Sequence, residues 1–174
     1  MINNNLSNIL REVESIVHLA GVYPYKSIND SSYQLWNKIH NVNVYSIYRI
    51  IQSILLTKYF KIKNIILVSS IAELIGSRDP AYTSSKSALI GLSKSLNKNL
   101  KKYNIRVNVV CPGLIDTQIS KIQNLEAKNK HVMNTLADRI GLSDDVSNLI
   151  KYLLDDESSY IWGNVIEVNG GMNK

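Results

Sequence analysis

The chain has 174 residues, of which 45% are hydrophobic, and a formal net charge of +6 at pH 7. This length and apolar content predict one globular domain with a sizeable core, which excludes a disordered chain. No apolar run reaches the roughly 18 residues that cross a bilayer, and the polar start of the sequence does not resemble a secretory signal. Cys111 is the single cysteine, so no internal disulfide can form, and we expect a cytoplasmic protein without a membrane partner.

The excess positive charge gathers in two lysine clusters, at 58–63 and 98–102, near the ends of two predicted helices. The helix dipole favours cations at helix C-termini, so these lysines are interpreted as solvated helix ends. Nucleic-acid binding is the alternative, but no recognised nucleic-acid motif accompanies the charge. We therefore expect no nucleic-acid partner.

The sequence pattern in the first third of the chain predicts a short strand between two helices. Residues 3–12 are compatible with a short helix, and the apolar run at 15–19 (SIVHL) predicts a buried strand. The segment 22–32 is rich in turn residues and predicts a loop. Apolar residues then recur at close to helical spacing from 33 to 59, which predicts one long amphipathic helix.

Strands and helices continue to alternate through the rest of the chain. Apolar runs predict strands at 64–69, 105–110 and 164–168, and a helix opening near Pro80 is predicted to run to about residue 103. The polar segment 114–138 predicts short helices that form a lid. Ser143 is a favourable N-cap for a last helix through 154. This alternation predicts an α/β fold with a parallel sheet and right-handed crossovers.

The stretch from Ser70 to Lys86 (SIAELIGSRDPAYTSSK) combines three chemical groups that suit proton transfer. Tyr82 and Lys86 lie four residues apart on the predicted helix, so their side chains project from one face. Ser70 follows the strand at 64–69, at the carboxyl edge where open α/β sheets bind ligands. A hydroxyl, a phenol and an ammonium can therefore meet beside a carbonyl or alcohol oxygen.

The tyrosine–lysine spacing is weak by itself, because Tyr59 and Lys63 share it. Only Tyr82 and Lys86 follow a strand that ends in two serines, and this position decides between the two pairs. Each residue also has a structural interpretation: Ser70 as a loop cap and Lys86 as a surface lysine. The same holds for Asn43 as a mid-helix asparagine, for His18 as a structural residue, and for His40 and His131 as surface residues. No His, Cys or Asp grouping has metal-ligand spacing, so no metal site is expected.

Taken together, a series of short motifs between residues 15 and 171 resembles the short-chain dehydrogenase/reductase family. The motifs are His18-Leu-Ala-Gly21, Trp36 with Asn43, the Ser70–Tyr82–Lys86 set, Asn104-Ile-Arg-Val-Asn108, Cys111-Pro-Gly113 with Ile115 and Thr117, Arg139-Ile-Gly141 before Asp145, and Trp162-Gly163 before Val168-Asn-Gly-Gly171. Each motif is weak alone, but the ordered series with near-family spacing is highly specific.

The resemblance implies an oxidoreductase that transfers hydride between a nicotinamide cofactor and an alcohol or carbonyl substrate. Tyr82 would be the general acid/base, with its pKa lowered by the Lys86 ammonium and by the nicotinamide ring. Ser70 would hydrogen-bond the substrate oxygen, and Asn43 would hold a water in a proton relay from Lys86. Besides Tyr82 and Lys86, the implied cofactor contacts are Ala20, Gly21, Pro112, Gly113, Ile115 and Thr117.

The family's glycine-rich pyrophosphate turn has no counterpart in these residues. The resemblance therefore implies one partial Rossmann-fold domain over 1–174, an N-terminally truncated doubly wound parallel sheet with strands equivalent to 4-5-6-7. The strand at 15–19 would then be an exposed edge that a partner could cover. Affinity for NAD or NADP would be weak, and the choice between them is not readable.

Two expectations concern assembly and activity. Relatives of this family associate through helices that match 33–59 and 82–103, so the resemblance implies a homo-oligomer. The alternative to an enzyme is a non-catalytic fragment or pseudoenzyme that acts as an interaction module. Intact Asn43, Ser70, Tyr82 and Lys86 favour the enzyme, and the missing glycine-rich turn favours the alternative.

Overall fold

Four parallel strands form one sheet in the order β1-β2-β3-β4 in the computed structural model, which describes residues 12–57 and 61–172. The strands are β1 (Ser15–His18), β2 (Asn64–Val68), β3 (Arg106–Pro112) and β4 (Val165–Val168). Within the register, Ser15 pairs with Asn64 and Asn64 with Arg106. The predicted α/β class with a parallel sheet is confirmed. The predicted helix at 3–12 lies outside the described residues except for its last residue.

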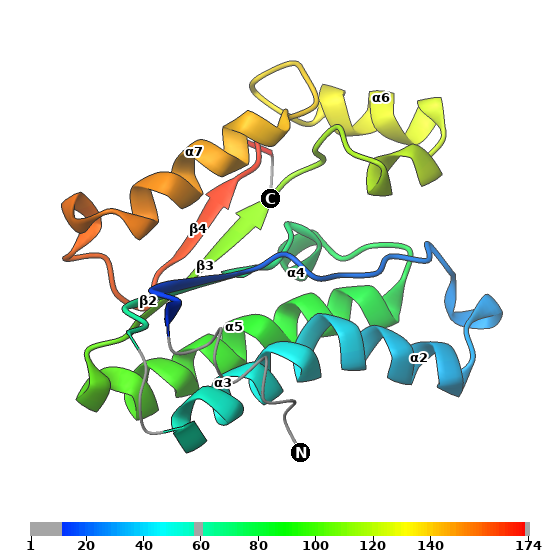
Figure 1. Cartoon of the computed structure of the whole chain (residues 1–174). Helices are drawn as coiled ribbons and strands as arrows, with labels where there is room; N and C mark the ends of the chain where they lie inside the picture. The colour runs from blue at the N-terminus through cyan, green and yellow to red at the C-terminus, as the bar shows by residue number, and fades with distance from the viewer. Residues whose placement is uncertain (1–11, 58–60, 173–174) are drawn as a thin grey trace.

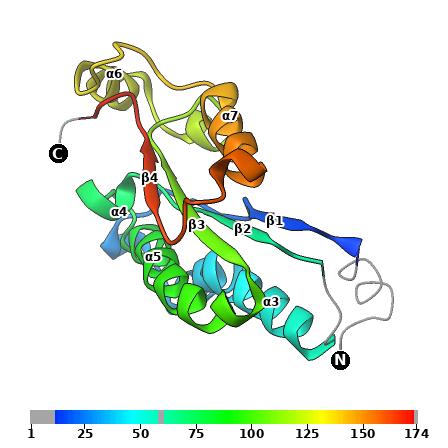
Figure 2. The ribbon, with the colours of Figure 1, turned by 90° about the vertical axis from the view of Figure 1, so that its left-hand side faces the viewer.

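Helices cover both faces of this sheet (Figures 1 and 2). One face carries α3 (Ser46–Thr57) and α5 (Pro80–Leu100), with α2 (Tyr33–His40) leading into α3, and the other face carries α7 (Ser143–Leu154). Two shorter helices, α4 (Ala72–Ile75) and α6 (Leu125–Met133), lie beyond the carboxyl ends of β2 and β3. The predicted lid at 114–138 thus contains α6 and a short 3-10 helix at Ile119–Ile122.

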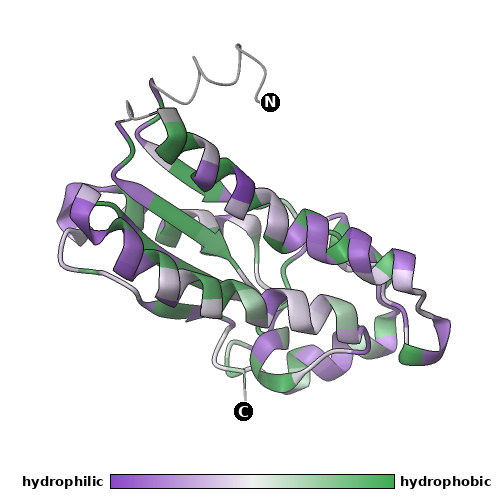
Figure 3. Cartoon of the chain, turned by 90° about the horizontal axis from the view of Figure 1, so that it is seen from below, coloured by the Kyte–Doolittle hydropathy of each residue, from purple (hydrophilic) through white to green (hydrophobic). Residues whose placement is uncertain are grey.

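Two apolar clusters hold these layers together, one on each face of the sheet. The larger joins α3 and α5 to the sheet through residues such as Ile47, Leu89 and Val107, and the smaller joins α7 through Val110 and Leu153. Every residue of β2 is buried, because helices cover both sides of the strand. The helices show both green and purple residues in Figure 3, as expected for amphipathic helices between core and solvent.

The predicted helix at 33–59 is helical without a break from Tyr33 to Thr57, but it is not a regular α-helix throughout. A π-helical segment, Asn41–Tyr45, separates α2 from α3, and residues 58–59 lie outside the described part. The wide turn contains Asn43, whose side chain is completely buried and bonds protein groups outside the helix. Such π segments occur mostly at functional sites, and periodicity alone could not reveal this one.

Side chains of aspartates set the starts of the two longest outer helices. Asp79 Oδ1 accepts a hydrogen bond from Tyr82 N at 3.1 Å, so α5 begins at Pro80, close to the predicted start. The Ser143 N-cap prediction was wrong by one residue, since Leu142 is the N-cap of α7. Asp145 replaces the serine cap by accepting from Leu142 N at 2.7 Å.

β1 lies at one edge of the sheet, as predicted for the strand at 15–19. Within the described residues it pairs with β2 alone, over the register from Ser15 to His18. This places the end of β1 and the following Gly21 at the same sheet edge as the ends of β2 and β3. The carboxyl ends of three strands therefore meet where the candidate site lies.

Candidate active site

A cavity of about 740 Å³ lies at the carboxyl ends of β1, β2 and β3. Its walls come from the loop after β1, the β2–α5 connection, and the segment between β3 and α7, which encloses α6. Eight of the predicted site residues line this one cavity: Gly21, Ser70, Tyr82, Lys86, Pro112, Gly113, Ile115 and Thr117. The exposed Ala20 and the buried Asn43 are not among its lining residues.

Ser70, Tyr82 and Lys86 lie together in this cavity, as the sequence predicted. The Ser70 side chain hydrogen-bonds the Tyr82 phenol, and the Lys86 Nζ lies 5.7 Å from the centre of the Tyr82 ring. Ser70 is also fixed at the helix start that follows β2, because its Oγ accepts from Ala72 N at 3.1 Å. A serine hydroxyl and a phenol therefore line the same cavity from two different elements.

Without a bound cofactor the pKa of Tyr82 is raised, whereas the family resemblance implied a lowered pKa. Burial raises the pKa of the phenol, and the carboxylate of Asp79 adds to the rise, whereas the hydrogen bond with Ser70 opposes it. The predicted lowering by the Lys86 ammonium is not present here. Tyr82 is consequently a neutral phenol at physiological pH, which is the form that donates a proton to a carbonyl oxygen.

Lys86 is an unusual lysine because only 5% of its surface is exposed. Burial lowers the pKa of its ammonium to about 8, and its Nζ donates to the Val68 carbonyl at 2.8 Å. Among the described residues no carboxylate pairs with it. An ammonium has three N–H donors, so two remain for acceptors such as the hydroxyls of a ribose.

Glycine at position 21 lies beside this ammonium. A side chain there would begin 3.5 Å from the Lys86 Nζ and 3.7 Å from Asn43 Oδ1. Gly113 is required for a different reason, because a Cβ would lie 2.9 Å from the Asn169 Cα and would force apart the ends of β3 and β4. These two glycines and the buried, unpaired ammonium fit the nicotinamide ribose of a dinucleotide.

Asn43 is buried outside the cavity and links two of the segments that surround it. Its Oδ1 accepts from Val22 N at 2.8 Å, and its Nδ2 donates to Ser85 Oγ at 2.9 Å. Both ends of the amide therefore bind protein groups and tie the loop after Gly21 to α5. The predicted water-holding role of Asn43 stays a prediction.

Two tyrosines of the predicted loop at 22–32 were not identified as site residues from the sequence. The Tyr23 ring lies 4.3 Å from the Tyr82 ring, and Tyr25 meets Tyr23 edge-on at 5.6 Å. Asp79 holds this loop in place by accepting from Lys26 N at 3.2 Å. Ten tyrosines in the chain made these two indistinguishable by composition, and only the fold selects them.

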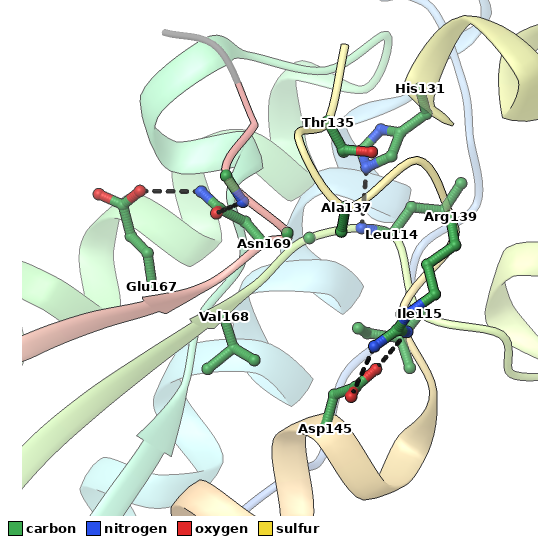
Figure 4. Close-up of a pocket in the computed structure, with 14 residues that line it drawn as sticks. Leu114, Ile115, His131, Thr135, Ala137, Arg139, Asp145, Glu167, Val168 and Asn169 are labelled. Carbon is green, nitrogen blue, oxygen red and sulfur yellow. Dashed lines mark hydrogen bonds and ion pairs between the residues drawn. The ribbon is translucent and has the colours of Figure 1, made fainter. Parts of the chain in front are cut away.

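A second, smaller hollow of about 330 Å³ lies beside the main cavity, at the ends of β3 and β4 (Figure 4). Asp145 binds the guanidinium of Arg139 through both carboxylate oxygens, at 2.6 and 3.0 Å. His131, interpreted from the sequence as a surface residue, instead accepts from Leu114 N at 3.0 Å and lines both hollows. Its role is to fix the chain direction after β3.

His18 is a buried structural residue at the end of β1, as predicted. Ser46 Oγ donates to Val42 O, so His18 Nε2 must donate to Ser46 Oγ, at 3.0 Å. The remaining Nδ1 is an unprotonated, buried acceptor without a hydrogen-bond partner. Burial, together with the nearby Lys86 ammonium, lowers the pKa of His18 to about 4.

The lowered pKa of His18 predicts that the folded chain loses stability in acid. The unfolded chain takes up a proton at His18 near pH 6.5 and the folded chain only near pH 4, so stability falls as pH drops through this window. We expect His18→Asn to remove about 2 kcal/mol of that loss. Urea unfolding of both proteins at pH 7 and pH 4.5 measures it. An unchanged difference between the two pH values in the variant would contradict the prediction.

Comparison with known proteins agrees with this geometry. A family model described as enoyl-(acyl carrier protein) reductase matches residues 2–173. The chain belongs to the short-chain dehydrogenase/reductase family. It is 34% identical to the 3-oxoacyl-(acyl-carrier-protein) reductase FabG of Chlamydia trachomatis over 178 aligned residues, which cover 99% of this chain and 71% of that protein. The Escherichia coli FabG is 31% identical over 92% of this chain and 67% of its own length.

Solved structures of short-chain dehydrogenases/reductases share the fold. A 4-hydroxyisoleucine dehydrogenase complexed with NADH has a TM-score of 0.85 at 27% identity, over 96% of this chain and 72% of that one. A family protein from Francisella tularensis has a TM-score of 0.85 at 29% identity, over 96% of this chain and 74% of its own. The chain thus spans about 70% of the length of these relatives. No helix in the described part of the chain is long and apolar enough to cross a membrane.

Proposed function

We propose that this short-chain dehydrogenase/reductase transfers hydride between a nicotinamide cofactor, NAD or NADP, and a carbonyl or alcohol substrate. The observation that carries the proposal is the buried Lys86 ammonium, which lies in one cavity with Tyr82 and Ser70 and has no carboxylate partner among the described residues. A buried, unpaired cation costs stability. Its retention beside a phenol is best explained by a ligand that binds both.

The chain's own residues would hold the cofactor and manage one proton. Lys86 would bind the nicotinamide ribose with its two remaining donors, while Gly21 and Gly113, with Ile115 and Thr117, would line the ring. When bound, the cofactor supplies or accepts the hydride. Ser70 would donate to the substrate oxygen, and the Tyr82 phenol would give that oxygen its proton during reduction and take it back during oxidation.

Carbonyl reduction is the direction that we propose to test first. The raised pKa of Tyr82 keeps the phenol protonated at neutral pH, ready to donate. The relatives from Chlamydia trachomatis and Escherichia coli are 3-oxoacyl reductases, which makes 3-oxoacyl thioesters the first substrates to test. Apolar side chains of the cavity, such as Ile71, Ile75 and Ile119, suit an aliphatic chain.

The test is oxidation of NADPH or NADH by the purified chain in the presence of acetoacetyl-CoA, followed by absorbance of the reduced nicotinamide. We expect substrate-dependent oxidation with one of the two cofactors. A Ser70→Ala variant should slow it by about a hundredfold, because one donor to the developing oxyanion is lost. The non-catalytic alternative predicts no oxidation with either cofactor at any substrate concentration.

Assembly with a second copy is part of the proposal. The helical stretch from α2 to α3 exposes large side chains, among them Trp36, Tyr45 and Tyr48, which are 38%, 49% and 43% exposed. We infer that α3 and α5 pack against the same helices of another copy. The open edge of β1 is a second candidate surface for a partner.

A further inference from the structure

The lining of the main cavity carries cations and no carboxylates. Three cations line it, Arg78, Lys86 and Lys130, and no Asp or Glu is among its lining residues. Lys86 belongs to the site for the nicotinamide ribose. Arg78 and Lys130 are exposed; Arg78 lies just before α5 and Lys130 lies on α6. A cavity with this charge distribution favours an anion.

Aromatic contacts connect Arg78 to the reacting phenol. The Arg78 guanidinium lies 5.4 Å from the centre of the Tyr25 ring. The Tyr25 ring touches Tyr23, and the Tyr23 ring lies over Tyr82. All four residues line the cavity. They form a continuous wall with the acid/base group at one end and a guanidinium at the other.

The backbone of Tyr25, in the middle of this wall, has an uncommon conformation. Tyr25 has a φ of +59°, in the left-handed region that residues other than glycine rarely adopt. Such a conformation costs free energy and persists where the surrounding structure enforces it, often at ligand sites. Here it turns the ring toward both Tyr23 and the Arg78 guanidinium.

The Arg78 guanidinium keeps its hydrogen-bonding capacity for a ligand. No ion pair joins it to a carboxylate within the described ranges. Asp30 is within electrostatic reach: its pKa is lowered chiefly by the hydrogen bond that Ser27 Oγ donates at 2.6 Å, and further by the charges of Lys26 and Arg78. A planar guanidinium matches one carboxylate through two parallel hydrogen bonds.

We propose that Arg78 and the Tyr23–Tyr25 wall form a subsite for a carboxylate at the far end of the substrate from the reacting carbonyl. This inference rests on the proposed function for the identity of the reacting end. The substrate class is then an oxo acid whose aliphatic body lies along the two tyrosine rings. Lys130, which also lines the cavity, adds long-range attraction for the same charge.

The test compares binding of 7-oxooctanoate and its methyl ester, which replaces the carboxylate charge with a neutral methyl ester group, by isothermal titration calorimetry. We expect the wild-type chain to bind the acid about ten- to a hundredfold more tightly than the ester, as for a charge-assisted pair. Arg78→Met replaces the guanidinium over the Tyr25 ring with an uncharged side chain and should remove this preference without weakening the ester. Lys151→Met removes a charge from α7, outside the cavity, and should keep the preference.

Three results would overturn the subsite: equal affinity for acid and ester, a preference that survives Arg78→Met, or binding of neither compound. Turnover separates this inference from the proposed function. Arg78-dependent binding of the acid without oxidation of NADPH or NADH would uphold the subsite and contradict the enzyme. Equal reduction of acid and ester, unaffected by Arg78→Met, would uphold the enzyme and contradict the subsite.

Discussion

The Tyr82→Phe variant is expected to lose about a thousandfold in kcat for carbonyl reduction while it still binds the reduced cofactor. General acid catalysis by a positioned side chain contributes roughly this much. The substitution removes one oxygen atom and keeps the ring that packs against Tyr23. The loss therefore appears in kcat, because the proton donor is absent, and little in the affinity for the nicotinamide.

The measurement is oxidation of NADPH or NADH with acetoacetyl-CoA, together with cofactor binding followed by fluorescence. Tyr160→Phe is the matched control, because Tyr160 is 98% exposed and does not line the cavity. It should retain full activity. An active Tyr82→Phe variant, within about tenfold of wild type, would exclude Tyr82 as the acid/base group.

Lys86→Met is expected to stabilise the chain and to abolish cofactor binding. The pKa of Lys86 falls from 10.5 to about 8 on folding, so holding its charge in the folded state at pH 7 costs about 3 kcal/mol. Methionine fills a similar volume without charge. Since the hydrogen bond to the Val68 carbonyl is also lost, which offsets about 1 kcal/mol, we expect a net gain of about 2 kcal/mol.

The pH dependence of this gain follows from the sign of the shift. Between pH 8 and 10.5 the unfolded lysine still holds a proton that the folded one has released, so wild-type stability rises with pH. The gain from Lys86→Met should therefore shrink over that range. Urea unfolding at several pH values measures it, with Lys151→Met as the control. A Lys86→Met chain less stable than wild type at pH 7 would show that the lysine is structural.

Local sequence was sufficient to predict that Ser70, Tyr82 and Lys86 converge. The four-residue spacing of Tyr82 and Lys86 and the position of Ser70 after β2 depend on neighbours along the chain, and the structure places them in one cavity. Helix boundaries were less predictable. The start of α7 depends on a side chain, Asp145, that caps from inside the helix. The π segment depends on the buried amide of Asn43.

Residues that act through distant contacts could not be predicted from the sequence. Tyr23 reaches Tyr82 across 59 positions of the chain. Arg78 lies in the stretch from Ser70 to Lys86, but its cation–π contact with the Tyr25 ring needs the left-handed backbone at Tyr25. The burial that lowers the pKa of Lys86 likewise depends on packing from several elements. Spacing identified which residues converge, and packing determined their protonation states.

Titration with reduced nicotinamide mononucleotide, followed by backbone amide NMR shifts, tests the central claim most directly. This probe lacks the adenosine half, so it reports on the cavity that holds Ser70, Tyr82 and Lys86. Saturable shifts at Gly21, Ser70, Gly113 and Thr117, absent in Lys86→Met, are the predicted result. Unchanged shifts at these residues at saturating probe, or shifts confined to the hollow around Arg139, would contradict a nicotinamide site at the carboxyl ends of β1, β2 and β3.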